Sequence, residues 1–147
     1  MRGFEKIKGY EQMEFPLPKR STKYSAGYDF ALIEDVLIPA GKIRSGKTGI
    51  KAFMQDDEVL KVYPRSSLAR KYQLTLSNNV GIIDKDYYNN PDNDGHILIS
   101  LRNFGETDIM LRKGERVAQG IFERYLVSPF EDEVQNDRNG GFGSTGK

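Results

Sequence analysis

Residues 116–127 read RVAQGIFERYLV, a run rich in the β-branched and aromatic residues that favour β-strands. Similar runs lie on its N-terminal side, and turn residues such as Pro39-Ala40-Gly41 and Lys113-Gly114 separate them. Short runs at regular spacing favour an antiparallel sandwich or barrel. The other runs are YDFALI (28–33), KTGIKAFM (47–54), EVLKVY (58–63), NVGII (79–83), HILISL (96–101) and TDIML (107–111).

Helix-forming sequence is scarce in this chain. Only residues 67–72 offer a turn or two of helix, with Ser67 in place to cap it. No longer window keeps an apolar period of 3.6 residues, and a doubly wound α/β fold needs crossover helices. The sequence therefore predicts an all-β domain.

Composition narrows the class of protein further. A length of 147 residues is typical of a single domain. The 22 basic and 21 acidic side chains nearly cancel, and the net charge of +1 predicts binding neither to nucleic acid nor to an anionic membrane. With no cysteine, disulfides, thiolate zinc sites and a cysteine nucleophile are excluded. No apolar run reaches the ~18 residues of a membrane span, and the polar N-terminus is unlike a signal peptide. We therefore expect a cytoplasmic globular domain.

Residues 41–48, GKIRSGKT, match the letters of the phosphate-binding P-loop. That motif needs a buried strand before it and a helix after it, so that helix N–H groups face the phosphates. Here a turn precedes the segment, and the strand-like run GIKAFM (49–54) follows it. We interpret the segment as strand, turn and strand.

Three other segments concentrate polar residues. PRSSL (64–68) places an arginine and two hydroxyls after a strand, which could bind an anion or simply cap a helix. NNVGIIDKDY (78–87) has two carboxylates beside an aromatic, and GERVAQ (114–119) could be only a hairpin turn. None of the three is decisive alone.

The last residues, NDRNGGFGSTGK (136–147), have the composition of a flexible tail. Phe142 is costly to leave in water, and Arg138 and the Ser-Thr pair are phosphate-binding groups. We therefore divide the chain into a β domain, 1–135, and a flexible C-terminal lid, 136–147.

Taken together, these segments resemble the five ordered motifs of the trimeric dUTPase family. The motifs are AGYDF (26–30), PRSSL (64–68), GIIDKDY (81–87), GERVAQ (114–119) and residues 138–146. The resemblance implies a distorted jelly-roll (β-clip) barrel in a homotrimer whose active sites combine several chains. It also implies hydrolysis of dUTP to dUMP and pyrophosphate, which keeps uracil out of DNA and supplies dUMP for thymidylate synthesis in a bacterium or phage.

The resemblance assigns roles to individual residues. Asp84 would be the base that activates a water for attack on the α-phosphorus. Asp29 would hold Mg²⁺ through the water shell of the ion. Tyr87 would lie against the deoxyribose and exclude a 2′-hydroxyl. Asn78, Gly81 and Ile83 would read uracil; Arg65, Ser66, Ser67 and Gln119 would bind the phosphates; and Arg138, Phe142, Gly143, Ser144 and Thr145 would close over the substrate.

The chain departs from the family pattern in two places. Residues 88–95, YNNPDNDG, form a longer polar loop after Tyr87, and the spacing from Arg138 to Phe142 is one residue shorter than usual. A regulatory protein partner, for which residues 88–95 are the candidate surface, remains open. His96 borders this loop, and we expect a solvated turn histidine.

Two alternatives stay in view. The dCTP deaminases share the fold and an Arg-Ser-Ser motif, but their proton-shuttling glutamate has no counterpart in ILISLR (97–102). The second is a non-catalytic protein that keeps the fold to sense a nucleotide. Intact Asp84, Asp29 and tail residues argue against it.

Overall fold

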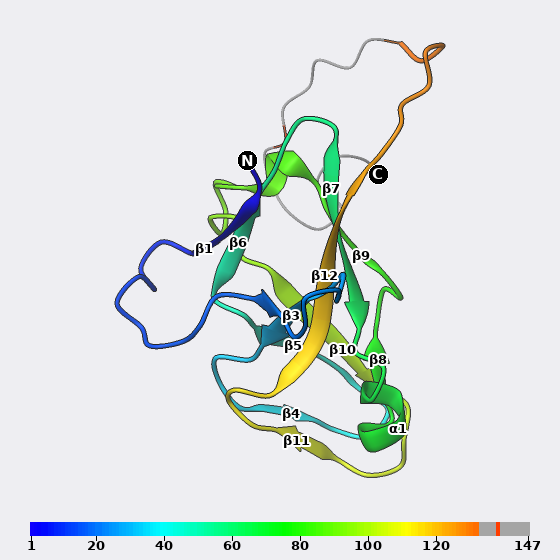
Figure 1. Ribbon diagram of the computed structural model, residues 1–147. Helices are drawn as coiled ribbons and strands as arrows, with labels where there is room; N and C mark the ends of the chain where they lie inside the picture. The colour runs from blue at the N-terminus through cyan, green and yellow to red at the C-terminus, as the bar shows by residue number, and fades with distance from the viewer. Residues whose placement is uncertain (133–137, 139–147) are drawn as a thin grey trace.

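The computed structural model describes residues 1–132 and 138, and within them it confirms the all-β prediction. The largest sheet has five antiparallel strands, and β7 and β12 form its long central pair (Figure 1). Its shorter strands lie outside that pair. In spatial order the strands are β2 (Lys19–Arg20), β3 (Tyr28–Ala31), β12 (Arg116–Arg124), β7 (Glu58–Pro64) and β9 (Gly81–Ile83).

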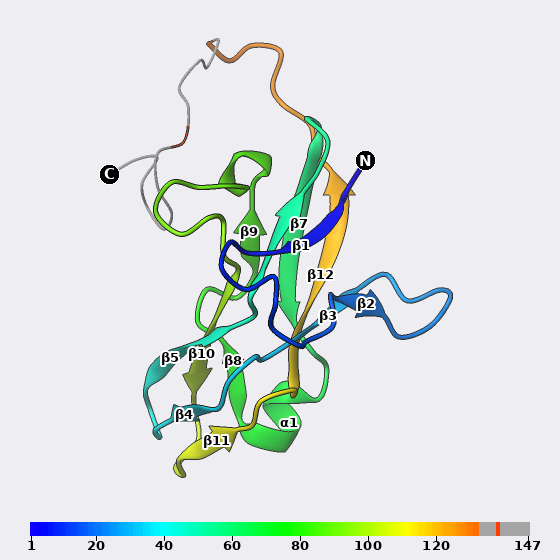
Figure 2. The same cartoon turned by 90° about the vertical axis from the view of Figure 1, so that its left-hand side faces the viewer.

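Smaller antiparallel sheets complete the jelly-roll-like body, and two short helical turns connect strands. Strands β4 and β11 run together at one end of the molecule, beside helix α1 (Figures 1 and 2). The sheets are β5 (Ile43–Lys47) with β10 (Leu98–Asn103) and β8 (Leu74–Leu76), β4 (Val36–Ile38) with β11 (Ile109–Leu111), and β1 (Gly3–Lys6) with β6 (Ile50–Phe53); the helices are α1 (Leu68–Tyr72) and the 3-10 turn η1 (Lys85–Tyr87).

The core fills the space between these sheets. Phe30, Leu60, Leu74 and Leu101 are fully buried, and together they join strands from both larger sheets. Phe4 of β1 contacts Phe30 edge-on at 5.6 Å between ring centroids, which attaches the N-terminal strand to the same core. This rigid body fixes the ends of β7 and β12, from which the candidate site residues extend.

Most expected strands are present, and the P-loop look-alike is indeed strand and strand, β5 followed by β6, with no helix after Thr48. Strands β1, β2, β4 and β8 were not predicted. Among the described residues, no helix is both long and apolar enough to cross a membrane.

The expectation of a solvated His96 is wrong. The residue is only 7% exposed, and its Nε2 accepts a hydrogen bond from the backbone N–H of Gly49 at 2.8 Å. Burial lowers the pKa of His96 to about 4, so the imidazole is neutral at pH 7 and can serve as that acceptor.

Beyond β12 the chain leaves the body as a stem, residues 125–130, which ends in a turn at Pro129 and Phe130 (Figures 1 and 2). Leu126 is 97% exposed and Phe130 94% exposed, and Val127 is also exposed. Tyr125 is tied to the body by hydrogen bonds to the carbonyls of Asp57 and Asp56, both 3.1 Å, and beyond it three apolar side chains project into solvent.

Candidate functional site

The polar segment NNVGIIDKDY (78–87) lines much of a pocket of about 230 Å³. Strand β9 pairs with β7 through Gly81 and Val62, and the chain then turns through η1, so that both sides of the hairpin face the same space. The volume is below the roughly 300–1,000 Å³ of a whole small-molecule site, so it suits part of a nucleotide. The predicted site residues that line it are Asn78, Gly81, Ile83, Asp84, Tyr87 and Arg138.

Arg138 lies across the mouth of this pocket. Its Nη2 donates to Asp84 at 2.7 Å and its Nε donates to Asp86 at 2.8 Å, and its side chain is 14% exposed. The guanidinium therefore binds two carboxylates, where the resemblance implied a phosphate. An anion binder placed beside Asp84 fits a negatively charged ligand at the same mouth.

A second cluster gathers around Asp29 on β3. Its carboxylate accepts a hydrogen bond from Ser21 at 2.8 Å and ion-pairs with Arg116 at 3.3 Å and Arg65 at 3.4 Å. The Asp29 side chain is only 12% exposed. Two guanidinium groups around one carboxylate leave a positive balance, so this cluster favours an anion such as a polyphosphate.

The ladder of the large sheet brings this cluster together. On β12, Gln119 lies opposite Asp29 of β3, and Ala118 lies opposite Pro64 of β7, directly before Arg65. The absence of a side chain at Gly27 leaves space for the Gln119 side chain, since a Cβ on residue 27 would lie 2.3 Å from Gln119 Oε1. Three polar segments far apart in the sequence thus meet at one end of the β7–β12 pair.

Ser66 and Ser67 complete this cluster. Both residues are exposed, and Ser67 occupies the N-cap position of α1 without a side-chain capping hydrogen bond. The expected capping bond is therefore not formed, and the Ser67 hydroxyl is free to contact a ligand.

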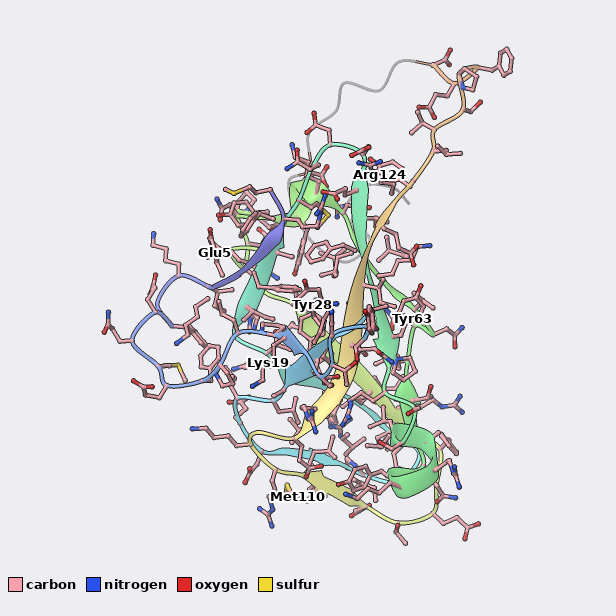
Figure 3. The ribbon with its side chains drawn as sticks, viewed as in Figure 1. Glu5, Lys19, Tyr28, Tyr63, Met110 and Arg124 are labelled. Carbon is pink, nitrogen blue, oxygen red and sulfur yellow. The ribbon has the colours of Figure 1, made fainter. Side chains whose placement is uncertain are left out.

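Asp84 and Arg65 lie toward opposite ends of β7. Asp84 comes one residue after the partner of Leu60, whereas Arg65 follows the other end of the strand. At about 3.3 Å per residue, the two lie roughly 20 Å apart along the sheet. Figure 3 marks these ends through Tyr63, on the side of the Asp29 cluster, and Arg124, on the other side. Within one chain the predicted site residues therefore form two half-sites.

The residues around Asp29 fit a magnesium ion that is contacted through its water shell rather than held directly by several side chains. Among residues 1–132 and 138, no three His, Cys, Asp or Glu side chains are grouped to hold a metal. Mg²⁺ keeps several waters and commonly binds through one or two carboxylates and substrate phosphates. Asp29 fits that kind of contact through water, and the triphosphate would supply the remaining ligands.

Sequence reasoning missed Ser21, Asp86 and Arg116 as members of these clusters. Arg116 stands within the GERVAQ segment and was therefore visible as a candidate. Ser21 joins Asp29 only through the pairing of β2 with β3, which has no local signal. Phe142, Gly143, Ser144 and Thr145 lie outside the described residues.

Comparisons with known proteins agree with one another. A family model described as dUTPase matches residues 13–146. The chain is 50% identical to the deoxyuridine 5′-triphosphate nucleotidohydrolase of Lactococcus lactis, over 99% of this chain and 98% of that protein. It is 37% identical to the protein of the same name from Rickettsia felis, over 96% and 95% of the two chains.

Solved structures give the same picture. The dUTPase from Streptococcus mutans superposes with a TM-score of 0.82 at 48% identity, covering 86% of this chain and 98% of that one. A dUTPase mutant from phage phi11 of S. aureus, described with a structural Mg(II) ion, has a TM-score of 0.71 at 17% identity, with coverage of 92% and 97%. At that identity the second likeness shows the fold alone.

Proposed function

The chain belongs to the dUTPase family and hydrolyses dUTP to dUMP, and from that premise we propose which residues carry each part of the reaction. The proposal is supported above all by the polar segments meeting in two half-sites, one around a pocket and one around paired arginines.

Asp84 is the general base. Its side chain is half exposed at the pocket mouth, where it can reach a water molecule, and Arg138 can leave this carboxylate to bind a substrate phosphate. The carboxylate takes a proton from the water as the oxygen bonds to the α-phosphorus, and the bond to the bridging oxygen of pyrophosphate breaks. The products are dUMP and pyrophosphate.

Arg65, Ser66, Ser67 and Gln119 bind the triphosphate. Negative charge builds up on the leaving pyrophosphate, so fixed donors at that place lower the barrier. Mg²⁺, when bound, neutralises phosphate charge, and Asp29 would hold its water shell. The loose spacing of 3.3–3.4 Å between Asp29 and its two arginines suits groups that turn toward phosphate when it arrives.

Asn78, Gly81, Ile83 and Tyr87 select the nucleoside. The pocket they line has a volume of only about 230 Å³, and a base read by the β9 hairpin would leave no room for a 5-methyl group. The ring of Tyr87, which is 8% exposed, supplies a wall for the deoxyribose. Arg138, Phe142, Gly143, Ser144 and Thr145 would close over the bound substrate.

The separation of the half-sites supports a homotrimer. A substrate whose base occupies the Asp84 pocket of one chain can place its phosphates against the Arg65 cluster of a neighbouring copy, whereas Asp84 and Arg65 of one chain lie roughly 20 Å apart along the sheet. A rotationally symmetric assembly repeats that contact and closes. A cytoplasmic location and a regulatory protein partner remain predictions.

The proposal is tested by pyrophosphate release from dUTP with Mg²⁺, measured beside dCTP, dTTP and UTP. We expect release from dUTP alone, its loss in the Asp84→Asn variant, and its suppression by EDTA with recovery on adding Mg²⁺. Ammonia release from dCTP would instead indicate a deaminase. Tight dUTP binding without turnover would indicate a nucleotide sensor.

A further inference from the structure

The loop of residues 88–95 folds back onto Tyr87, the residue just before it. Asn93 Nδ2 donates to the Tyr87 hydroxyl at 2.7 Å, and that hydroxyl donates to the backbone carbonyl of His96 at 2.7 Å. The Tyr87 hydroxyl is therefore held by two groups from the C-terminal end of the loop. Because the hydroxyl is occupied by protein partners, Tyr87 presents ring carbons to the pocket.

Hydrogen bonds within the loop hold Asn93 beside the Tyr87 hydroxyl. Asn93 Oδ1 accepts from the backbone N–H of Gly95 at 3.1 Å, an Asx-type turn, and Asp94 N–H donates to the carbonyl of Asn90 at 2.7 Å. Gly95 has φ +83°, and a Cβ there would lie 2.5 Å from the Tyr87 carbonyl oxygen. Glycine is therefore required for the loop to pass this close to Tyr87.

A lysine fastens the loop to the body. Lys51 of β6, whose side chain is 10% exposed, donates to Asn89 Oδ1 at 2.5 Å and to Asp94 Oδ2 at 2.8 Å. Its ammonium group also lies 4.9 Å from the centre of the Tyr88 ring. A partly buried, charge-assisted contact of this kind holds the loop more firmly than an exposed ion pair would.

We propose that Asn93 is a positioning residue for sugar selection, acting through the Tyr87 hydroxyl. The inference rests on the proposed role of Tyr87 at the deoxyribose. With its hydroxyl held from two sides, the phenol cannot swing aside to admit a ribose 2′-hydroxyl. Residues 88–95 are thus an internal brace for the nucleoside pocket.

The test measures the ratio of kcat/KM for dUTP to kcat/KM for UTP in Asn93→Ser. Serine can keep the turn by accepting from the Gly95 N–H, but it is too short to reach the Tyr87 hydroxyl. One neutral hydrogen bond corresponds to a change of about three- to tenfold, so we expect the ratio to fall by about fivefold, mainly through faster UTP turnover. The melting temperature should change little.

A double-mutant cycle separates positioning from loop folding. In a Tyr87→Phe background there is no hydroxyl to hold, so Asn93→Ser should cause no further fall in the ratio. A further fall there, or an unchanged ratio in Asn93→Ser alone, would overturn the inference. Asp92→Ala, an exposed change in the same loop, is the matched control and should leave the ratio unchanged.

Failure of the proposed role of Tyr87 itself would look different. Replacing the ring by a smaller apolar side chain, Tyr87→Leu, should lower the ratio more than either change to Asn93 or the hydroxyl. If Tyr87→Leu leaves the ratio unchanged, Tyr87 does not select the sugar. If it lowers the ratio while Asn93→Ser does not, only the inference about Asn93 fails.

Discussion

At the residue scale, His96 shows how burial changes the behaviour of one side chain. The imidazole packs near the Tyr10 ring, with centroids 6.0 Å apart, and the charges of Lys47 and Glu34 act on it with opposite sign. Desolvation is the largest cause of the lowered pKa. A protonated imidazole could no longer accept the hydrogen bond from the N–H of Gly49.

This pKa predicts acid sensitivity. The pKa of His96 is about 4 in the folded protein and 6.5 for a histidine in the unfolded chain, so the unfolded chain binds the extra proton more readily. The contribution of His96 to stability is complete above pH 6.5 and declines as the pH falls toward 4, by at most about 3 kcal/mol. Urea unfolding between pH 7 and pH 4.5 measures it.

The matched variant is His96→Gln, whose side-chain oxygen can accept from the Gly49 N–H without titrating near neutral pH. We expect the difference in unfolding free energy between the two proteins to shift in favour of the variant as the pH falls through this window. A difference that does not vary with pH would contradict the assignment.

At the scale of the elements, a fully buried amide joins β10 to β4, two strands that belong to different sheets. Asn103, at the end of β10, donates to the carbonyls of Ile38 at 2.9 Å and Thr107 at 2.8 Å. Its Oδ1 accepts from the N–H of Gly105 at 2.9 Å. The side chain thereby fixes β4 and the turn that leads into β11.

Asn103→Leu should therefore destabilise the fold strongly. The change leaves three backbone groups without their hydrogen-bond partner, the Ile38 carbonyl in a buried position and the other two partly buried, and we expect a loss of about 3 kcal/mol in the free energy of unfolding. Arg102→Ala, an exposed change one residue earlier in β10, should alter it by less than about 0.5 kcal/mol. Chemical denaturation measures the unfolding free energy of both variants, and an unchanged m-value would show that both unfold as the parent protein does.

Strands with a strong pattern of their own were predictable from the sequence. The alternation around β10 is an example: Ile97, Ile99 and Asn103 are buried, whereas Arg102 is exposed. Strand β2 has two residues and β4 and β8 have three, and such short segments are extended only because a neighbour pairs with them. That information is non-local, so it was missed.

Part of the candidate site was likewise predictable from the sequence and part was not. Asp29, Arg65 and Gln119 were identified as site residues through the motifs, and the sheet register places them together. The brace formed by residues 88–95 was not foreseeable, because its composition indicates only a polar loop. Its contact with Tyr87 depends on the path by which Gly95 returns across the Tyr87 carbonyl.

At the scale of the whole molecule, the two half-sites predict complementation between inactive chains. Arg65→Ala and Asp84→Asn should each abolish dUTP hydrolysis. When the two variants are refolded together, a site shared between chains can combine the intact Asp84 of an Arg65→Ala chain with the intact Arg65 of an Asp84→Asn chain. An equal mixture should regain about one quarter of wild-type activity, because each half is intact half of the time.

The alternative outcome is equally clear. If one chain supplied a complete active site, mixing the two variants would restore nothing above the activity of each alone. The control is a mixture of two Arg65→Ala preparations treated in the same way, which lacks an intact Arg65 half in every arrangement.

The exposed stem of residues 125–130 has a consequence for the life of the protein in a cell. Extended, accessible chain is a preferred substrate for proteases. A single cut in this stem would separate the β body from Arg138, Phe142, Ser144 and Thr145 while leaving the core of the body untouched. Degradation could therefore end the activity of a chain long before its fold is lost, and a chain whose stem is covered by a neighbour would outlive one that stands alone.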